Sequence, residues 1–222
     1  MFNKQKGMVS LHHSKAKKIL LMNPKGGVGK STCSAALMSH LSHLGYSVEV
    51  IDFDKQRLCY GWAKEVFPDS CQPYVPSFRS LSNIGITLKV KRNTDFVVID
   101  SPSNFTEEEM TRYTYFIDAI LLPISPSPLD LQASLQFIES IIESGILSRR
   151  NISLAFLLNR CRVDDNRVEI TSHSLKNFQC YPTLGKMSEN TQYQDAFHYK
   201  KILPSSVDKK LWLDVIGWLE QL

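Results

Sequence analysis

The chain has 222 residues, of which 43% are hydrophobic and 22% are charged, the balance of a globular protein with a sizeable core. This composition excludes a disordered chain, a collagen-like chain and a small disulfide scaffold, and the longest apolar runs are far shorter than the roughly 20 residues of a membrane-spanning helix. The formal net charge is only +4, so any contact with nucleic acid must come from a local basic patch.

The N-terminal segment, residues 1–18, carries several lysines and no apolar periodicity. We therefore expect a basic, flexible arm over residues 1–18. No internal repeat or low-complexity linker divides the remainder, so we expect a single domain over residues 19–222.

The remainder of the chain alternates short apolar runs with longer helical patterns. We expect strands over residues 19–23, 47–52, 96–100, 119–123 and 152–159, and helices over residues 30–44, 57–66, 107–116, 129–144 and 207–219. The strand segments are continuously apolar, which is typical of a parallel sheet covered on both faces. The predicted fold is α/β, with a doubly wound, mostly parallel sheet and helices on both faces.

A glycine-rich segment, Asn23-Pro-Lys-Gly-Gly-Val-Gly-Lys-Ser-Thr32, joins the first expected strand to the first long helix. Its glycines let backbone N–H groups turn toward a phosphate, and the helix directs its positive end at the same anion. In such a loop the lysine pairs with the β- and γ-phosphates, and the first hydroxyl is placed for Mg²⁺. The strict G-x-x-x-x-G-K-[ST] pattern is not met, because Pro24 occupies its first position. The predicted nucleotide-binding residues are Gly26, Gly27, Val28, Gly29, Lys30, Ser31 and Thr32, with Ser31 also the predicted metal ligand.

This segment resembles the deviant P-loop of the ParA/MinD ATPases, Lys-Gly-Gly-x-x-Gly-Lys-Ser/Thr, whose first lysine is the signature lysine of the family. The resemblance implies a P-loop NTPase that binds ATP and Mg²⁺ and forms a homodimer in the ATP state. It also implies that Lys25 reaches across the dimer to the nucleotide of the other subunit. There Lys25 would stabilise phosphate charge, the task that an arginine finger performs in other NTPases.

The second expected strand ends in Ile51-Asp-Phe-Asp-Lys-Gln-Arg57, which is similar to the Asp-x-Asp-Pro-Gln switch of that family. Hydrolysis needs a carboxylate at the carboxyl end of a strand, beside the γ-phosphate. The resemblance implies that Asp52 lies near the Mg²⁺ shell and that Asp54 orients the attacking water, together with Lys25 and Lys30 as catalytic residues. Lys55 departs from the usual proline.

Two later segments match the same family. Asp95-Phe-Val-Val-Ile-Asp-Ser-Pro102 resembles the Walker B strand, so Asp100 is expected to hold a Mg²⁺-bound water at the carboxyl edge of the sheet. Leu122-Pro-Ile-Ser-Pro-Ser-Pro-Leu-Asp130 is similar to the proline-rich loop of the short, ParF-like plasmid-partition proteins. The family places this loop at the dimer face, and a plain rigid turn is the alternative.

Asn159 ends another apolar strand and matches the family position that commonly reads the adenine edge. A capping asparagine is the alternative interpretation.

Family members that carry cargo bind DNA nonspecifically as ATP dimers, and a partner protein stimulates hydrolysis and release. The resemblance implies the same cycle here, with a centromere-binding or cargo-adaptor protein as the partner. Phosphate contacts require only positive charge within reach of the DNA backbone. The candidate DNA contacts are Lys200, Lys201, Lys209, Lys210, Arg149 and Arg150.

The alternative function is that of a MinD-like regulatory ATPase at a membrane or cell pole. The last expected helix has an apolar stripe, but acidic residues share its polar face, so we predict a core helix and no stable membrane association. Five cysteines without a C-x-x-C pair argue against a disulfide framework, a zinc site and an iron–sulfur reductase. We expect a cytoplasmic, nucleoid-associated protein. The stripe consists of Leu211, Trp212, Val215, Ile216 and Leu219.

Overall fold

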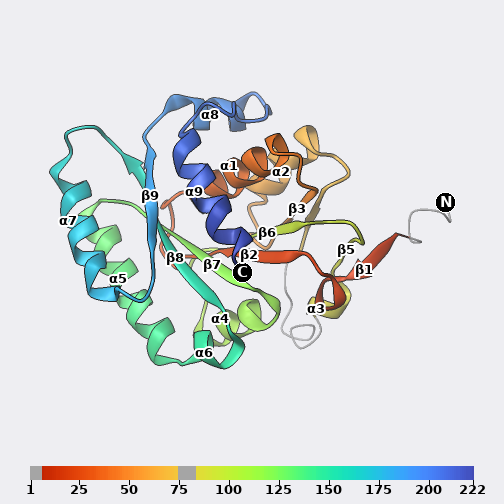
Figure 1. The fold of residues 1–222 in the computed structure, drawn as a ribbon, viewed down its shortest axis with the longest axis horizontal. Helices are drawn as coiled ribbons and strands as arrows, with labels where there is room; N and C mark the ends of the chain where they lie inside the picture. Colours follow the sequence, from red (N-terminus) through yellow and green to blue (C-terminus); the bar gives the residue numbers. More distant parts are fainter. Residues whose placement is uncertain (1–6, 75–83) are drawn as a thin grey trace.

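The computed structural model describes residues 7–74 and 84–222. Within this part of the chain, seven parallel strands form one sheet in the order β4-β3-β6-β2-β7-β8-β9 (Figure 1). The strands are β2 (Lys17–Leu21), β3 (Val48–Asp52), β4 (Cys71–Pro73), β6 (Phe96–Asp100), β7 (Ala119–Ile124), β8 (Ser153–Cys161) and β9 (Thr183–Ser188).

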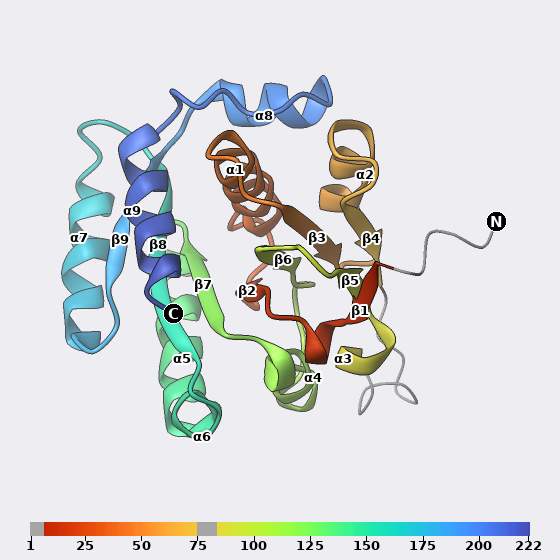
Figure 2. The ribbon, with the colours of Figure 1, turned by 45° about the vertical axis from the view of Figure 1, so that its right-hand side comes forward.

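Helices pack on both faces of this sheet, so the predicted doubly wound α/β fold is confirmed (Figures 1 and 2). One face is covered by α1 (Lys30–His43), α2 (Leu58–Val66), α8 (Thr191–His198) and α9 (Lys209–Glu220). The other face is covered by α4 (Glu107–Tyr113), α5 (Pro128–Glu143), α6 (Ile146–Arg150) and α7 (Asn166–Leu175).

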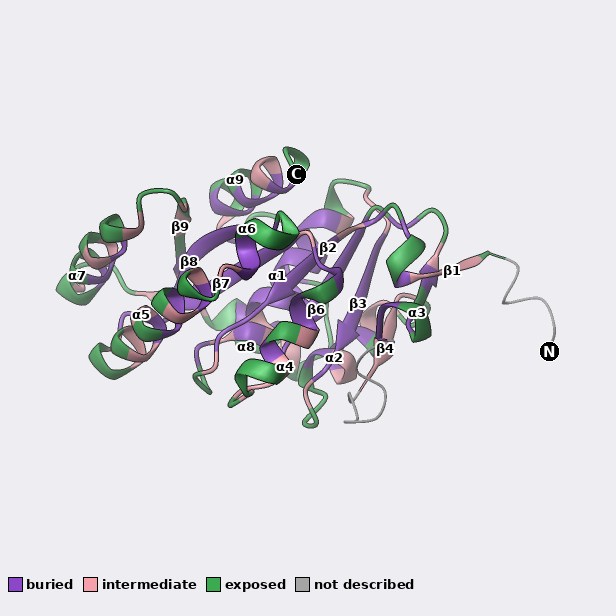
Figure 3. Ribbon diagram, turned by 90° about the horizontal axis from the view of Figure 1, so that it is seen from below, coloured by how far each residue is buried: buried purple, intermediate pink, exposed green. Residues whose placement is uncertain are grey.

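The central strands are buried on both sides, as Figure 3 shows. In β2, Ile19 and Leu21 contact the α1 side, whereas Leu20 belongs to the cluster on the α4 and α5 side. Because neighbouring side chains of a strand point to opposite faces, a strand covered on both faces is apolar at most positions. This is why β6 and β7 are nearly unbroken apolar runs, whereas β3 also buries Glu49 and Asp52.

The expected flexible arm over residues 1–18 differs from the structure in its described part. The chain forms β1 (Met8–Ser10), which pairs antiparallel with β5 (Lys89–Lys91), and β2 begins at Lys17. Leu11 is fully buried. The lysines misled the prediction because their long stems can be buried while the ammonium group finds a partner. The Lys17 ammonium donates to the backbone carbonyl oxygens of Leu219 and Glu220, at 2.9 and 2.8 Å.

Three elements in the last third of the chain, α7, β9 and α8, were not expected from the sequence. β9 is an edge strand and only one of its residues, Met187, is buried, so it carries no apolar run. Each of the two helices buries only a narrow stripe, three residues in α7 and two in α8. Their formation depends on packing against the sheet rather than on a strong local pattern.

The C-terminal helix α9 packs as part of the core. All five residues of its predicted apolar stripe are buried, in the same cluster as α1 and α8, so the core-helix prediction is confirmed. No helix within residues 7–74 and 84–222 has the length and apolarity needed to cross a membrane.

Candidate nucleotide-binding site

Because all seven strands are parallel, their carboxyl ends meet at one edge of the sheet. The order of the strands reverses at β2, which lies between β6 and β7. In open α/β sheets, ligands bind beside the carboxyl ends at such a reversal point. The glycine-rich loop leaves β2 at this point and leads directly into α1.

The loop needs glycine at two positions. Gly27 and Gly29 have φ angles of +81° and +92°, in the left-handed region. A Cβ atom on Gly29 would lie 2.1 Å from the side-chain nitrogen of the buried Asn159, so one of the two groups would have to shift. Gly29 is the N-cap residue of α1, so the free N–H groups of the first helical turn point to the loop.

Asn23 anchors the start of the loop. Its side-chain nitrogen donates to the Pro123 carbonyl oxygen and to the Ser134 hydroxyl, both at 2.9 Å, and its oxygen accepts the Lys25 N–H at 2.9 Å. Asn23 is fully buried. The loop is therefore attached to β7 and α5 as well as to its own strand. No role for Asn23 was expected from the sequence, and its position directly before the loop is the only sequence signal for one.

Lys30 points back across the loop that it follows. Its ammonium group donates to the Lys25 carbonyl oxygen at 3.2 Å and to the Ser103 hydroxyl at 3.0 Å, and the residue is only 6% exposed. Burial lowers the pKa of Lys30, while the charges of Asp100 and Asp54 act in the opposite direction. Lys30 is thus a largely buried cation in a loop of backbone donors, which suits a phosphate. Ser31 and Thr32 follow it in the half-buried first turn of α1.

Asp100 ends β6 and is completely buried. One carboxylate oxygen accepts the Ser34 hydroxyl at 3.2 Å, and the other has no hydrogen-bond partner. Burial, followed by the charge of Asp52, raises the pKa of Asp100 to about 7. A buried carboxylate oxygen without a donor suits a cation, and Mg²⁺ is usually held by one or two carboxylates together with substrate phosphates. The donor set around Asp100 and Ser31 therefore fits Mg²⁺.

Asp52 lies directly opposite Asp100 in the pairing of β3 with β6. Both of its carboxylate oxygens accept backbone N–H groups, from Asp54 at 2.9 Å and from Tyr60 at 2.8 Å. Burial raises the pKa of Asp52. These bonds shape the turn between β3 and α2, and this turn presents the half-buried Asp54. A place for Asp52 in the Mg²⁺ shell stays a prediction.

Lys25 is exposed on the loop and forms an ion pair with Asp130, in the first turn of α5. The ammonium nitrogen lies 3.7 Å from a carboxylate oxygen, with 44% of the Lys25 side chain and 22% of the Asp130 side chain exposed. Asp130 belongs to the proline-rich segment, so this segment touches the signature-type lysine. Such an exposed pair is weak and easily exchanged for another partner.

Asn159 lies beneath the phosphate loop and is 2% exposed. Its side-chain nitrogen donates to the Val28 carbonyl oxygen at 2.7 Å, and its oxygen accepts the Arg160 N–H at 2.8 Å. In this arrangement the side chain supports the loop through the Val28 carbonyl. Reading of an adenine edge by Asn159 stays a prediction.

The candidate DNA contacts do not form one patch. Arg149 and Arg150 belong to α6, at the bottom of Figure 1, whereas the four lysines flank α8 and the start of α9 on the other face of the sheet. Arg150 also lies over the Tyr115 ring, 4.1 Å from its centre, and Lys210 pairs with Asp214 at 2.6 Å. The structure therefore separates these residues into two groups.

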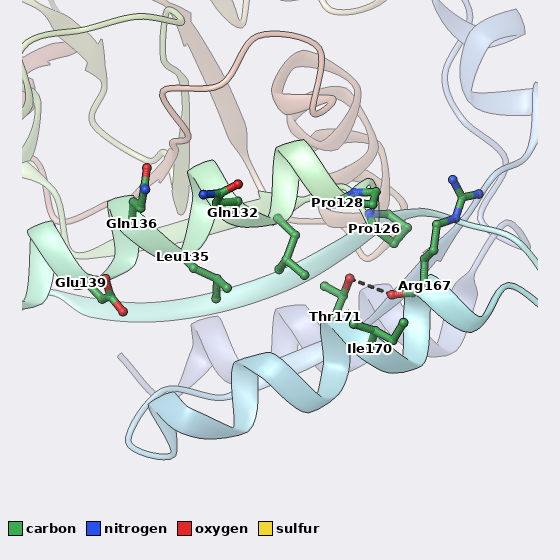
Figure 4. Close-up of a pocket in the computed structure, with 10 residues that line it drawn as sticks. Pro126, Pro128, Gln132, Leu135, Gln136, Glu139, Arg167, Ile170 and Thr171 are labelled. Carbon is green, nitrogen blue, oxygen red and sulfur yellow. Dashed lines mark hydrogen bonds between the residues drawn. The ribbon is translucent and has the colours of Figure 1, made fainter.

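A groove lies between α5 and α7, and Pro126 and Pro128 of the proline-rich segment line one end of it (Figure 4). This groove has a volume of about 350 Å³, and its apolar lining includes Pro126, Pro128, Leu131, Leu135 and Ile170. The prolines thus do more than turn the chain out of the sheet after β7.

Most of the sequence matches one known protein family. The profile of the CobQ/CobB/MinD/ParA nucleotide binding domain matches residues 19–203. The chain belongs to this family. The predicted relationship to the ParA/MinD proteins is therefore confirmed, and the chain is a ParA/MinD-type nucleotide-binding protein of a family whose ParA and MinD members are ATPases.

The similar proteins of this family carry names that refer to different processes. The chain is 32% identical to the maintenance of carboxysome distribution protein A of Halothiobacillus neapolitanus, over 66% of this chain and 68% of that protein. It is 30% identical to protein ParA of Rhizobium radiobacter, over 62% of this chain and 61% of that protein. The narrower likeness to ParF-like plasmid-partition proteins stays a prediction.

Solved structures share the fold. A single-residue variant of Cyanothece McdA in complex with ATP has a TM-score of 0.69 at 15% identity and covers 94% of this chain and 98% of that chain. The MinD protein of Pyrococcus horikoshii with Mg-ADP has a TM-score of 0.66 at 17% identity and covers 93% and 100%. At these identities the likeness concerns the fold alone.

Proposed function

We propose that this protein is an ATP-dependent dimer switch that hydrolyses ATP and uses the cycle to segregate or position a cargo. The observation that carries the proposal is the geometry at the end of β2. There a loop of backbone donors, the largely buried Lys30 ammonium and the unpartnered oxygen of Asp100 lie at one edge of the sheet. Mg²⁺, held through Ser31 and Asp100, would neutralise charge on the phosphates.

The chain's own residues suggest how each step would be divided. The first turn of α1 and Lys30 would bind the phosphates, and Asp54 would orient the attacking water. Lys25 would leave its weak pair with Asp130 to reach the nucleotide of the second subunit in the ATP dimer. A centromere-binding or cargo-adaptor protein would stimulate hydrolysis and so end the dimeric state.

In this proposal the ATP dimer binds DNA without sequence preference and so resides on the nucleoid in the cytoplasm. The lysines around α8 and the start of α9 support this, because Lys200, Lys201 and Lys209 are exposed and form no ion pair within the described residues. Arg149 and Arg150, on the opposite face of the sheet, would not share that surface.

The test is binding to a duplex of random sequence with ATP, with ADP and without nucleotide, each at two salt concentrations. We expect the duplex to bind only in the presence of ATP. The affinity should fall steeply at the higher salt concentration, since each phosphate contact releases a counterion. A confirmed ATP dimer that binds no duplex would contradict the DNA function. Sedimentation with anionic liposomes under the same conditions tests the MinD-like alternative, which the buried apolar stripe of α9 disfavours.

A further inference from the structure

A cleft of about 490 Å³ lies beside the phosphate loop, between α2 and α8. Ser31 and Thr32 of α1 form its inner end, Leu58 and Gly61 line it from α2, and Phe197 lines it from α8. Figure 2 shows α8 next to α1, with one end toward α2, on this face of the sheet. The cleft thus adjoins the nucleotide site and lies on the face of the sheet that carries the candidate lysines around α8 and the start of α9.

The charge of this cleft has one sign. Arg57 at the start of α2 and Lys200 after the end of α8 both line the cleft and are both exposed. His198, two residues before Lys200, lines it as well. None of the described residues that line it is an aspartate or a glutamate. Exposed cations without neighbouring carboxylates favour an anionic ligand.

Both of these cations occupy backbone positions that favour glycine. Arg57 has a φ angle of +54° and Lys200 has a φ angle of +50°, in the left-handed region. A residue with a Cβ atom has a free-energy cost there that glycine avoids. The presence of arginine and lysine rather than glycine at these two positions is explained if the cleft requires their positive charge.

The two walls of the cleft are attached to each other and to the switch turn. The Trp62 indole N–H of α2 donates to the Lys201 carbonyl oxygen at 2.9 Å, and its ring lies 5.9 Å from that of Phe197. The Arg57 N–H donates to the Asp54 carbonyl oxygen at 3.0 Å. A displacement of the Asp54 turn by bound nucleotide would therefore move Arg57 relative to Lys200.

We infer that Arg57 and Lys200 together hold the sugar–phosphate backbone of duplex DNA in the cleft between α2 and α8. This inference rests on the proposed DNA-binding function and adds Arg57, a residue of the switch region, to the DNA surface. A DNA strand presents phosphates to the two cations and apolar deoxyribose faces to Leu58, which is 54% exposed, and to Phe197. The arrangement links DNA affinity to the state of the nucleotide through the turn that holds Asp54.

The experiment measures binding of a fluorescein-labelled duplex of random sequence to the ATP dimer over a series of salt concentrations. The variants are Arg57→Gln, Lys200→Gln and the double variant. Each single variant should reduce the slope of log affinity against log salt by about 0.9 for each subunit of the dimer that contacts the duplex, and the double variant by about twice as much. Lys176→Gln is the matched control, since Lys176 is an exposed cation at the end of α7 and does not line the cleft. Its slope should equal that of the wild-type protein.

A folding defect is separated from a lost contact by Arg57→Gly. Glycine relieves the left-handed backbone, so this variant should melt at or above the wild-type temperature and still show the reduced slope. Asp164→Gly, at another exposed position with a positive φ angle of +62°, is the control for the backbone change alone and should keep the wild-type slope.

The outcomes separate this inference from the proposed function. A wild-type ATP dimer that binds no duplex contradicts the proposed function itself. A wild-type dimer that binds, with Arg57→Gln retaining the full slope, overturns the inference and leaves the function standing. If the variants lose binding to polyglutamate but retain binding to the duplex, the cleft serves an acidic protein segment and the inference is wrong.

Discussion

Replacing Asn159 by alanine distinguishes the two roles that the sequence left open for this side chain. The variant removes two short hydrogen bonds in a buried place, those to the Val28 carbonyl oxygen and from the Arg160 N–H. Loss of the bond from the Arg160 N–H costs about 1 kcal/mol, and the buried Val28 carbonyl left without a partner costs about 1–3 kcal/mol. Together these terms predict a loss of about 2–4 kcal/mol in the free energy of unfolding.

For a protein of this length, a loss of that size lowers the melting temperature by roughly 5–12 °C. The assay is thermal unfolding without nucleotide, followed by titration calorimetry with ATP and with GTP. Because Asn159 supports the loop from beneath, we expect ATP and GTP affinities to fall by the same factor. Asn177→Ala, at an exposed asparagine, is the matched control and should melt like the wild-type protein.

A variant of wild-type stability that has lost only its preference for ATP over GTP would contradict the supporting role of Asn159. In that case the side chain reads the base and the bond to Val28 is incidental.

Three further variants test the division of roles at the site. Lys25→Ala should have a free energy of unfolding within about 1 kcal/mol of the wild-type value, because the pair of Lys25 with Asp130 is exposed and weak. In light scattering it should fail to dimerise with ATP. Normal dimerisation and turnover would remove the chain from the signature-lysine class. Asp54→Ala should bind ATP and accumulate as the dimer, and normal phosphate release would mean that another residue orients the water. The pKa of Asp100 is raised to about 7 from its ordinary value of 3.8. Without Mg²⁺ the folded state therefore retains a proton that the unfolded chain releases. Because of this difference, the free energy of unfolding falls as pH rises from about 4 through about 7. Asp100→Asn should remove this fall. In EDTA at pH 8 it should raise the free energy of unfolding, measured with urea, by up to about 4 kcal/mol. An unchanged pH dependence would show that another group titrates.

Much of the fold could be predicted because its central strands are buried on both faces. The expected strand over residues 96–100 coincides with β6, and the expected helix over residues 30–44 extends one residue past the end of α1. The expected helix over residues 129–144 is displaced by one residue from α5. Such segments must be apolar throughout or in a regular stripe, and that requirement is visible locally. The edge of the sheet was harder, since β9 has only one buried residue.

The phosphate loop is the part of the site that could be predicted from the sequence alone. Its glycines, Lys30 and the following hydroxyls act through backbone conformation and helix direction, which are properties of one short segment. The order of the two carboxylates Asp52 and Asp100 along the chain also indicated the carboxyl edge of the sheet.

The contacts of each side chain at that edge became visible only in the folded chain. It gave both oxygens of Asp52 backbone donors and left one oxygen of Asp100 without any. It brought Asn159 against the loop from a strand more than a hundred residues away, and Arg57 into one cleft with Lys200. Burial and hydrogen-bond partners depend on which elements of the chain pack together, and no single segment of the sequence contains that information.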